Sequence, residues 1–325
     1  MTISTGSANG QLARMTDAHP CGRPPGRIPI ANDRGEAIVT PADWRRLAPP
    51  AAPHHWREYR SAYELAHAWT RGDGAERLAA MLGMREGLAG IQLERGIAER
   101  RSWFDDIPGK PRHHDLLVLA RTNPGLVVVG IEAKADEPFD RELLELTAAA
   151  RRRFHATRAP QRVDRLTRAF FGTTLDEEPA LGALRYQLLS ALAGTLVEAG
   201  RRRATVAVLA VHEFITPETA AIKRQRNARD LDAFVARLGS APRIAGPDGA
   251  WIAGPFAVRG NAHLPADVPV YIGHIVSRVE RRAPSAARPP RTSGVGSRGS
   301  AEASLAPLGA EPLAAGGGPS PEDGR

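Results

Sequence analysis

"HHDLLVLARTNPGLVVVGIEAKADEPF", residues 113–139, is the stretch that decides the fold of this chain. It contains two apolar, β-branched runs joined by the turn sequence TNPG, a pattern typical of a β-hairpin. Both faces of the hairpin are apolar, so we expect it to lie inside a sheet covered on both sides. Yet one end carries Asp115, Glu132 and Lys134. Charges at the end of a buried hairpin are costly unless they are paired or bound to a metal.

The register of the hairpin determines which of these side chains meet. Glu132 and Lys134 share one face, because side chains alternate along a strand. If the Asn-Pro pair is at the centre of the turn, Asp115 lies opposite Glu132; if the turn is centred one residue later, Asp115 lies opposite Lys134. Both registers bring the three charged groups to the same face and the same end of the hairpin.

Two carboxylates side by side repel, so one of them has a raised pKa unless a cation lies between them. Mg²⁺ takes one or two protein carboxylates and leaves its other positions to water and phosphate. A neighbouring ammonium group can orient or help to deprotonate the attacking water. These residues therefore predict a Mg²⁺ (or Mn²⁺) site formed by Asp115 and Glu132, with Lys134 activating water. The alternative is an ordinary ion-pair cluster of the same residues.

This arrangement resembles the PD-(D/E)XK, or restriction-endonuclease-like, nuclease superfamily. Its signature is an Asp at a strand end, followed by Glu-x-Lys at the end of the next strand. The matching residues are Asp115, Glu132 and Lys134, and His114 stands where the signature has Pro. The resemblance implies that the acids bind metal, that the lysine assists the water, and that the substrate is nucleic acid, DNA in preference to RNA. It leaves a homodimer open.

A second resemblance covers most of residues 56–276. "EAKADEPFDR", "RVDRL", "LRYQLLSALAGTLVEA" and "AVLAVHEF" are similar to segments of an uncharacterised bacterial domain family that is assigned to the same superfamily. Because the function of that family is not established, the similarity implies a fold and no activity. A non-catalytic nucleic-acid-binding or protein-interaction module that retains the fold is therefore the alternative to a nuclease.

Further site candidates come from the flanking segments. Gln187 corresponds to a helix Gln that points at the site in several branches of the superfamily. Glu99 corresponds to an additional upstream metal ligand, or is a surface residue. Arg185 is a candidate phosphate contact through charge-assisted hydrogen bonds. Glu137 is either an auxiliary site residue or a cap of the following helix.

A histidine-based metal site is a competing hypothesis. His113 and Asp115 face the same way on their strand and could share an ion with His212 and Glu213. His114 faces the opposite way and could not join them.

Composition excludes several classes of protein. The chain of 325 residues is 42% hydrophobic and 25% charged, which is ordinary for a globular protein. Its single cysteine, Cys21, excludes a disulfide framework and a cysteine-based zinc site. No apolar run is long enough for a membrane span, and no signal-peptide core follows the N-terminus, so we expect no membrane partner and a cytoplasmic location.

Charge points toward an anionic partner. The net charge is +8 with a pI near 10.4, which favours nucleic acid. However, only three of the 44 basic residues are Lys (Lys110, Lys134 and Lys223). The Arg bias also follows the codon usage of a GC-rich genome, so charge alone does not decide the partner.

The periodicity predicts one α/β domain with a restriction-endonuclease-like core, in which helices flank a central mixed sheet. We expect a disordered leader at 1–40, the domain at 41–282 and a disordered Pro/Gly-rich tail at 283–325. Helices are expected at 61–72, 74–84, 140–156, 162–172, 181–200 and 216–239, with Ser61 as an N-cap and Pro217 in a first turn. Strands are expected around 96–107, 115–121, 126–134, 204–214, 251–259 and 268–276.

Overall fold

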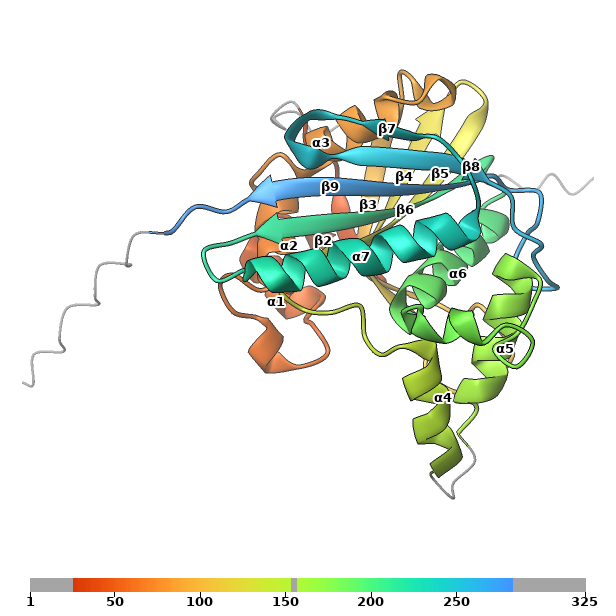
Figure 1. Cartoon of the computed structure of the whole chain (residues 1–325). Helices are drawn as coiled ribbons and strands as arrows, with labels where there is room; N and C mark the ends of the chain where they lie inside the picture. The colour runs from red at the N-terminus through yellow and green to blue at the C-terminus, as the bar shows by residue number, and fades with distance from the viewer. Residues whose placement is uncertain (1–25, 153–156, 283–325) are drawn as a thin grey trace, which may run out of the picture. The chain divides into compact units, whose positions relative to one another are not determined.

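The computed structural model describes residues 26–152 and 157–282, and these form a mixed sheet with helices on both faces (Figure 1). The predicted α/β class with a central mixed sheet is thereby confirmed. The strands are β1 Ile30–Asn32, β2 Ala37–Ile38, β3 Gln92–Ser102, β4 Arg112–Thr122, β5 Gly125–Lys134, β6 Val206–Ile215, β7 Arg243–Ala245, β8 Trp251–Phe256 and β9 Val270–Arg278.

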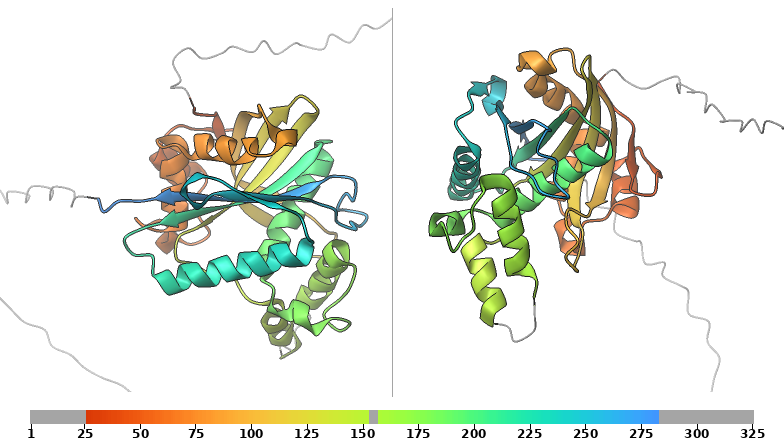
Figure 2. Two further views of the ribbon diagram at one scale, coloured as in Figure 1. Left: turned by 45° about the horizontal axis from the view of Figure 1, so that its top comes forward. Right: turned by 90° about the vertical axis from the view of Figure 1, so that its right-hand side faces the viewer.

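The helices divide into two groups along the chain. They are α1 Pro41–Leu47, α2 Ser61–Thr70, α3 Gly74–Gly83, α4 Leu143–Arg152, α5 Ala159–Phe171, α6 Tyr186–Arg201 and α7 Ala221–Leu238. The first three pack on one face of the sheet, and α4 to α7 pack on the other. Figure 2 shows the two groups on opposite sides of the strands.

The sheet has the order β2-β1-β3-β4-β5-β6-β9-β8-β7. Strands β3, β4 and β5 form an antiparallel meander. The chain then crosses over through α4, α5 and α6, and β6 pairs parallel with β5 and with β9. Parallel neighbours end at the same edge, so the C-terminal ends of β5 and β6 lie side by side.

The central hairpin is buried as the sequence predicts. Leu117, Leu119 and Val128 face the helices α4 to α7, and Val118 and Val129 face α1 to α3. Because each strand is apolar on both faces, only a position covered on both sides keeps these side chains from water. The polar end of the hairpin therefore lies within a covered sheet.

Three details differ from the predictions. The prediction of a disordered leader at 1–40 is wrong for residues 26–40. Ile28, Ile30 and Ile38 of that segment are buried in the core, and β1 pairs with β3. Residues 1–25 and the expected tail at 283–325 lie outside the described residues. Ser61 is the first residue of α2 rather than its N-cap. Pro217 precedes α7, which begins at Ala221.

Candidate active site

The observed register is the first of the two predicted ones. Leu116 pairs with Ile131 and Leu117 with Gly130, and continuing this register places Asp115 opposite Glu132. The ladder is not continued there. Instead, the Asp115 carboxylate (Oδ2) accepts a hydrogen bond from the backbone N–H of Ala133 at 2.7 Å. The side chain of Asp115 thus takes the place of a backbone partner and is held beside β5.

Glu132 is the centre of the cluster and is only 1% exposed. Its Oε1 accepts hydrogen bonds from Lys134 Nζ at 2.7 Å and from Gln187 Nε2 at 2.5 Å. Its Oε2 accepts from the guanidinium of Arg112. The structure therefore brings Glu132, Lys134 and Gln187 together, as the sequence predicts. Arg112 was not predicted, because one arginine among 41 carries no distinguishing sequence signal.

The two carboxyl groups differ in acidity. Burial raises the pKa of Asp115 to about 8, and the negative charge of Glu132 adds to this effect while Lys134 opposes it. Burial also acts to raise the pKa of Glu132, but the charges of Arg112 and Lys134 outweigh it and hold that pKa below its ordinary value. Two adjacent carboxyls with separated pKa values are a common feature of catalytic sites.

Glu99 lies on β3, next to this cluster. Its backbone is left-handed (φ 51°), and the β3–β4 ladder is interrupted between the pairs Ala98–Leu116 and Arg100–His114. Burial raises the pKa of Glu99, opposed by His113, whose Nδ1 lies 3.6 Å from the carboxylate. In residues 26–152 and 157–282, no three His, Cys, Asp or Glu side chains are grouped so as to hold a metal ion. A metal-binding role for Glu99 stays a prediction.

The histidine-based alternative is not assembled. His212 is fully buried; its Nδ1 accepts from Trp69 Nε1 at 3.3 Å and its Nε2 lies 2.9 Å from Ser277 Oγ. Both ring nitrogens are therefore engaged by protein, on the face covered by α2. Burial lowers the pKa of His212, and likewise that of His114, to about 3. Both histidines are neutral parts of the core.

Two other candidates have structural partners. Arg185 binds Asp230 at 2.9 Å and Glu142 at 3.4 Å, so its guanidinium is already occupied by carboxylates. Glu137 accepts hydrogen bonds from the backbone N–H of Ala135 at 2.9 Å and from Ser61 Oγ at 3.1 Å. It holds the turn after β5 against the start of α2 and does not cap the following helix.

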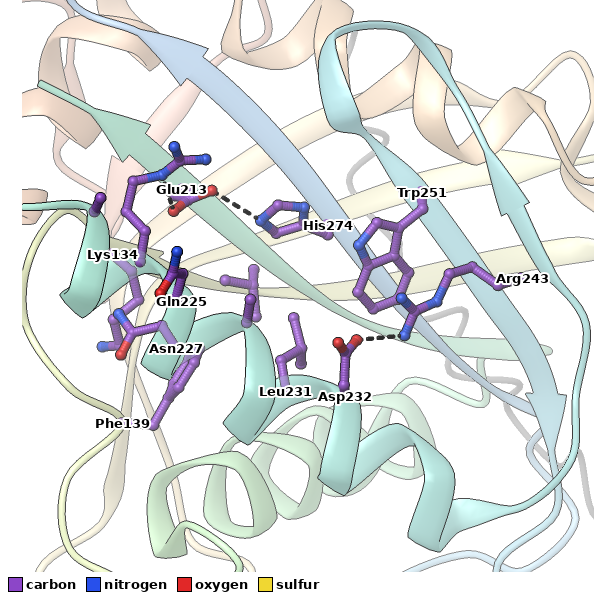
Figure 3. A pocket seen from close by; sticks show the side chains of 14 residues that line it. Lys134, Phe139, Glu213, Gln225, Asn227, Leu231, Asp232, Arg243, Trp251 and His274 are labelled. Atoms are coloured by element: carbon purple, nitrogen blue, oxygen red, sulfur yellow. Dashed lines mark hydrogen bonds and ion pairs between the residues drawn. The ribbon is translucent and has the colours of Figure 1, made fainter. Parts of the chain in front are cut away.

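A pocket that the sequence did not predict adjoins Lys134 (Figure 3). It has a volume of about 360 Å³ and is lined by residues of α7 and of the strands β5 to β9. Glu213 lies within it and binds Arg224 at 3.0 Å and His274 at 3.4 Å. Its residues come from four separate parts of the chain, so no local motif could reveal it.

A domain of unknown function (DUF6946) matches residues 37–278 of the chain. No curated protein and no solved structure matches it. Among the described helices, none is both long and apolar enough to cross a bilayer.

Proposed function

The chain belongs to the DUF6946 family, whose function is unknown, and from the geometry of its site we propose that it is a divalent-metal-dependent nuclease that hydrolyses phosphodiester bonds. The observation that carries the proposal is that Asp115 accepts a hydrogen bond from the backbone N–H of Ala133 at 2.7 Å, next to Glu132, which itself accepts from Lys134 Nζ at 2.7 Å, at the end of a buried hairpin. The two acids have separated pKa values, and a lysine adjoins the one that is ionised.

The topology supports the same proposal. A helix precedes the meander β3-β4-β5, and α6 then leads to the parallel strand β6. This order resembles the core of the PD-(D/E)XK nucleases, in which the acids and the lysine occupy the ends of the second and third strands. Fold similarity alone does not establish an activity, so the proposal depends on the side chains.

The donor atoms suit a hard divalent cation. Asp115 and Glu132 offer only oxygen atoms, which Mg²⁺ and Mn²⁺ prefer, and Mg²⁺ needs no more than one or two carboxylates. When bound, such an ion lowers the pKa of a bound water and neutralises charge on the phosphate. To hold it, Asp115 gives up its proton and Glu132 exchanges one of its present hydrogen-bond donors. DNA is the expected substrate in preference to RNA.

The remaining side chains then have distinct tasks. Lys134 Nζ lies within hydrogen-bond distance of Glu132, so it can orient a water at the same place and donate to a phosphate oxygen. Gln187 holds Glu132 in position from α6. Arg112 contributes positive charge at the edge of the cluster, where charge on a pentacoordinate phosphorus needs stabilisation.

The test is cleavage of supercoiled plasmid, single-stranded DNA and RNA in Mg²⁺ or Mn²⁺. We compare wild type with Lys134→Met, which removes the ammonium and keeps most of the side-chain volume. Lys110→Met, at an exposed loop lysine, is the matched control. The proposal is supported if wild type cuts in a metal-dependent way and Lys134→Met lowers the cleavage rate at least about 100-fold, the effect of losing a group that acts on the transition state. No cutting of any substrate by wild type contradicts it.

One observation favours a second candidate function. Without any metal, both oxygens of Glu132 already have donors, from Arg112, Lys134 and Gln187. A cluster so satisfied would also stabilise a non-catalytic module that binds nucleic acid or protein. Wild type that binds nucleic acid but never cleaves it is the result expected for this alternative.

A further inference from the structure

The pocket beside Lys134 is built for a ligand of its own. Its volume of about 360 Å³ lies within the range of roughly 300–1,000 Å³ that is usual for small-ligand sites. Its lining combines the apolar side chains of Val211, Ala228 and Leu231 with polar side chains. The acid cluster described above reaches this pocket only through Lys134.

One end of the pocket has a flat stacking surface. The Arg243 guanidinium lies 3.9 Å from the centroid of the Trp251 ring, and Asp232 holds it there at 2.8 Å. The His274 ring lies 5.7 Å from the same Trp251 ring. Aromatic rings and arginine planes are the surfaces on which nucleobases stack, whatever their sequence.

The opposite end contains Lys134, Phe139 and Asn227 (Figure 3). Asn227 is 8% exposed, and its Nδ2 donates to the backbone carbonyl of Glu137 at 2.8 Å. That bond fixes the orientation of the amide. Its Oδ1 is buried without a hydrogen-bond donor in the described protein. A buried acceptor of this kind is costly.

The charges around the pocket favour an anion. In the pocket lining, Glu213 and Asp232 balance the charges of Arg224 and Arg243, so Lys134 supplies the excess positive charge. Both acids are already engaged by arginine. A ligand that matches the stacking surface and the lysine is planar and aromatic and is attached to a phosphate.

We propose that this pocket binds a nucleobase whose attached phosphate lies against Lys134. The base stacks on the Trp251–Arg243 pair, and Lys134 is shared between the pocket and the acid cluster. The inference deepens the proposed nuclease function and rests on it for one point, that the phosphate belongs to a strand to be cut. The same chemistry also fits a free nucleotide.

Binding without metal tests the pocket separately from catalysis. The full chain in EDTA is titrated against a fluorescein-labelled single-stranded DNA pentamer and against an abasic pentamer with the same phosphates. We expect the pentamer with bases to bind about tenfold or more tightly, as base–aromatic stacking implies. Trp251→Ala should abolish this preference, and Trp251→Phe should keep most of it because the ring remains. Arg243→Gln, at a part-exposed residue, is a second variant and should weaken it.

The outcomes separate the two proposals. If wild type never cleaves DNA but Trp251→Ala removes the preference for bases, the nuclease proposal fails and the pocket inference stands. If wild type cleaves DNA but neither Trp251→Ala nor Arg243→Gln changes the preference, the pocket inference is overturned alone. Competition by dAMP distinguishes the sources: displacement of the pentamer at equal concentration supports a free nucleotide as the ligand, and displacement only by DNA supports a strand.

Discussion

Replacing Arg112 with Leu should destabilise the protein through the charge of Glu132. Glu132 is 1% exposed, and the side chain of Arg112 is 14% exposed. Removing one partner of a buried ion pair costs about 3–5 kcal/mol, because the other charge stays buried. Lys134 and Gln187 still bind the second oxygen of Glu132, so we expect the lower end, about 3 kcal/mol.

The assay is urea unfolding at neutral pH together with thermal unfolding. For a domain of this size about 3 kcal/mol lowers Tm by roughly 6–12 °C. In a Glu132→Gln background no buried charge is left without a partner, so Arg112→Leu should lower the free energy of unfolding by less than about 1 kcal/mol. If Arg112→Leu costs the same in both backgrounds, the arginine acts through packing, and the electrostatic reasoning is wrong.

The pH dependence of this effect has a defined sign. In wild type the pKa of Glu132 is lowered on folding, so its contribution is present above the unfolded pKa, near 4.5, and is lost as the pH falls through the folded value. The difference between wild type and Arg112→Leu should therefore shrink below that pH. Adding Mg²⁺ should also shrink it, because a cation beside Glu132 replaces the missing guanidinium.

Three further results are expected. His212 and His114 both have their pKa lowered to about 3 by burial, whereas an unfolded His binds a proton below about pH 6.5. The free energy of unfolding should therefore fall as the pH drops from about 6.5 toward 3, and His212→Gln should remove the part of that dependence that belongs to His212; an unchanged dependence would contradict a neutral His212. A Cβ at Gly130 would lie 2.1 Å from Thr195 Oγ1, so Gly130→Ala should lower the free energy of unfolding by about 1–3 kcal/mol. The control is Gly83→Ala, where a Cβ meets nothing within 4 Å, and equal effects of the two variants would contradict the packing of α6 on β5. The pKa of Asp115 is raised to about 8, so a metal ion must displace the proton of this carboxyl group in order to bind. The affinity for Mn²⁺, measured by calorimetry, should therefore rise between about pH 6.5 and about pH 8 in wild type and should not change with pH in Asp115→Asn.

The hairpin and its polar end could be predicted from sequence because their signals are local. Strand alternation and the turn sequence limited the register to two choices, and both placed Asp115, Glu132 and Lys134 together. The structure adopts the register in which Asn123 and Pro124 are the central turn residues, because Thr122 pairs with Gly125.

Features formed by distant segments could not be predicted. Trp251, Arg243 and Asn227 meet in one pocket from a helix and two short strands, and none of them has a local signature. The role of Arg112 could not be predicted because the chain contains 41 arginines and nothing in the sequence distinguishes this one. The segment 26–40 looked irregular because β1 and β2 have only three and two residues, and they are strands only because β3 pairs with β1.

The proposed nuclease function requires Asp115 and Glu132 to hold a divalent metal together. The most direct measurement is the anomalous difference density of a crystal soaked in Mn²⁺. We expect a peak between the two carboxylates, with ligand distances of about 2.1 Å and with Arg112 or Lys134 moved away from Glu132. No peak there, with Glu132 still bound by Arg112, Lys134 and Gln187, would contradict the metal site and leave a structural ion-pair cluster.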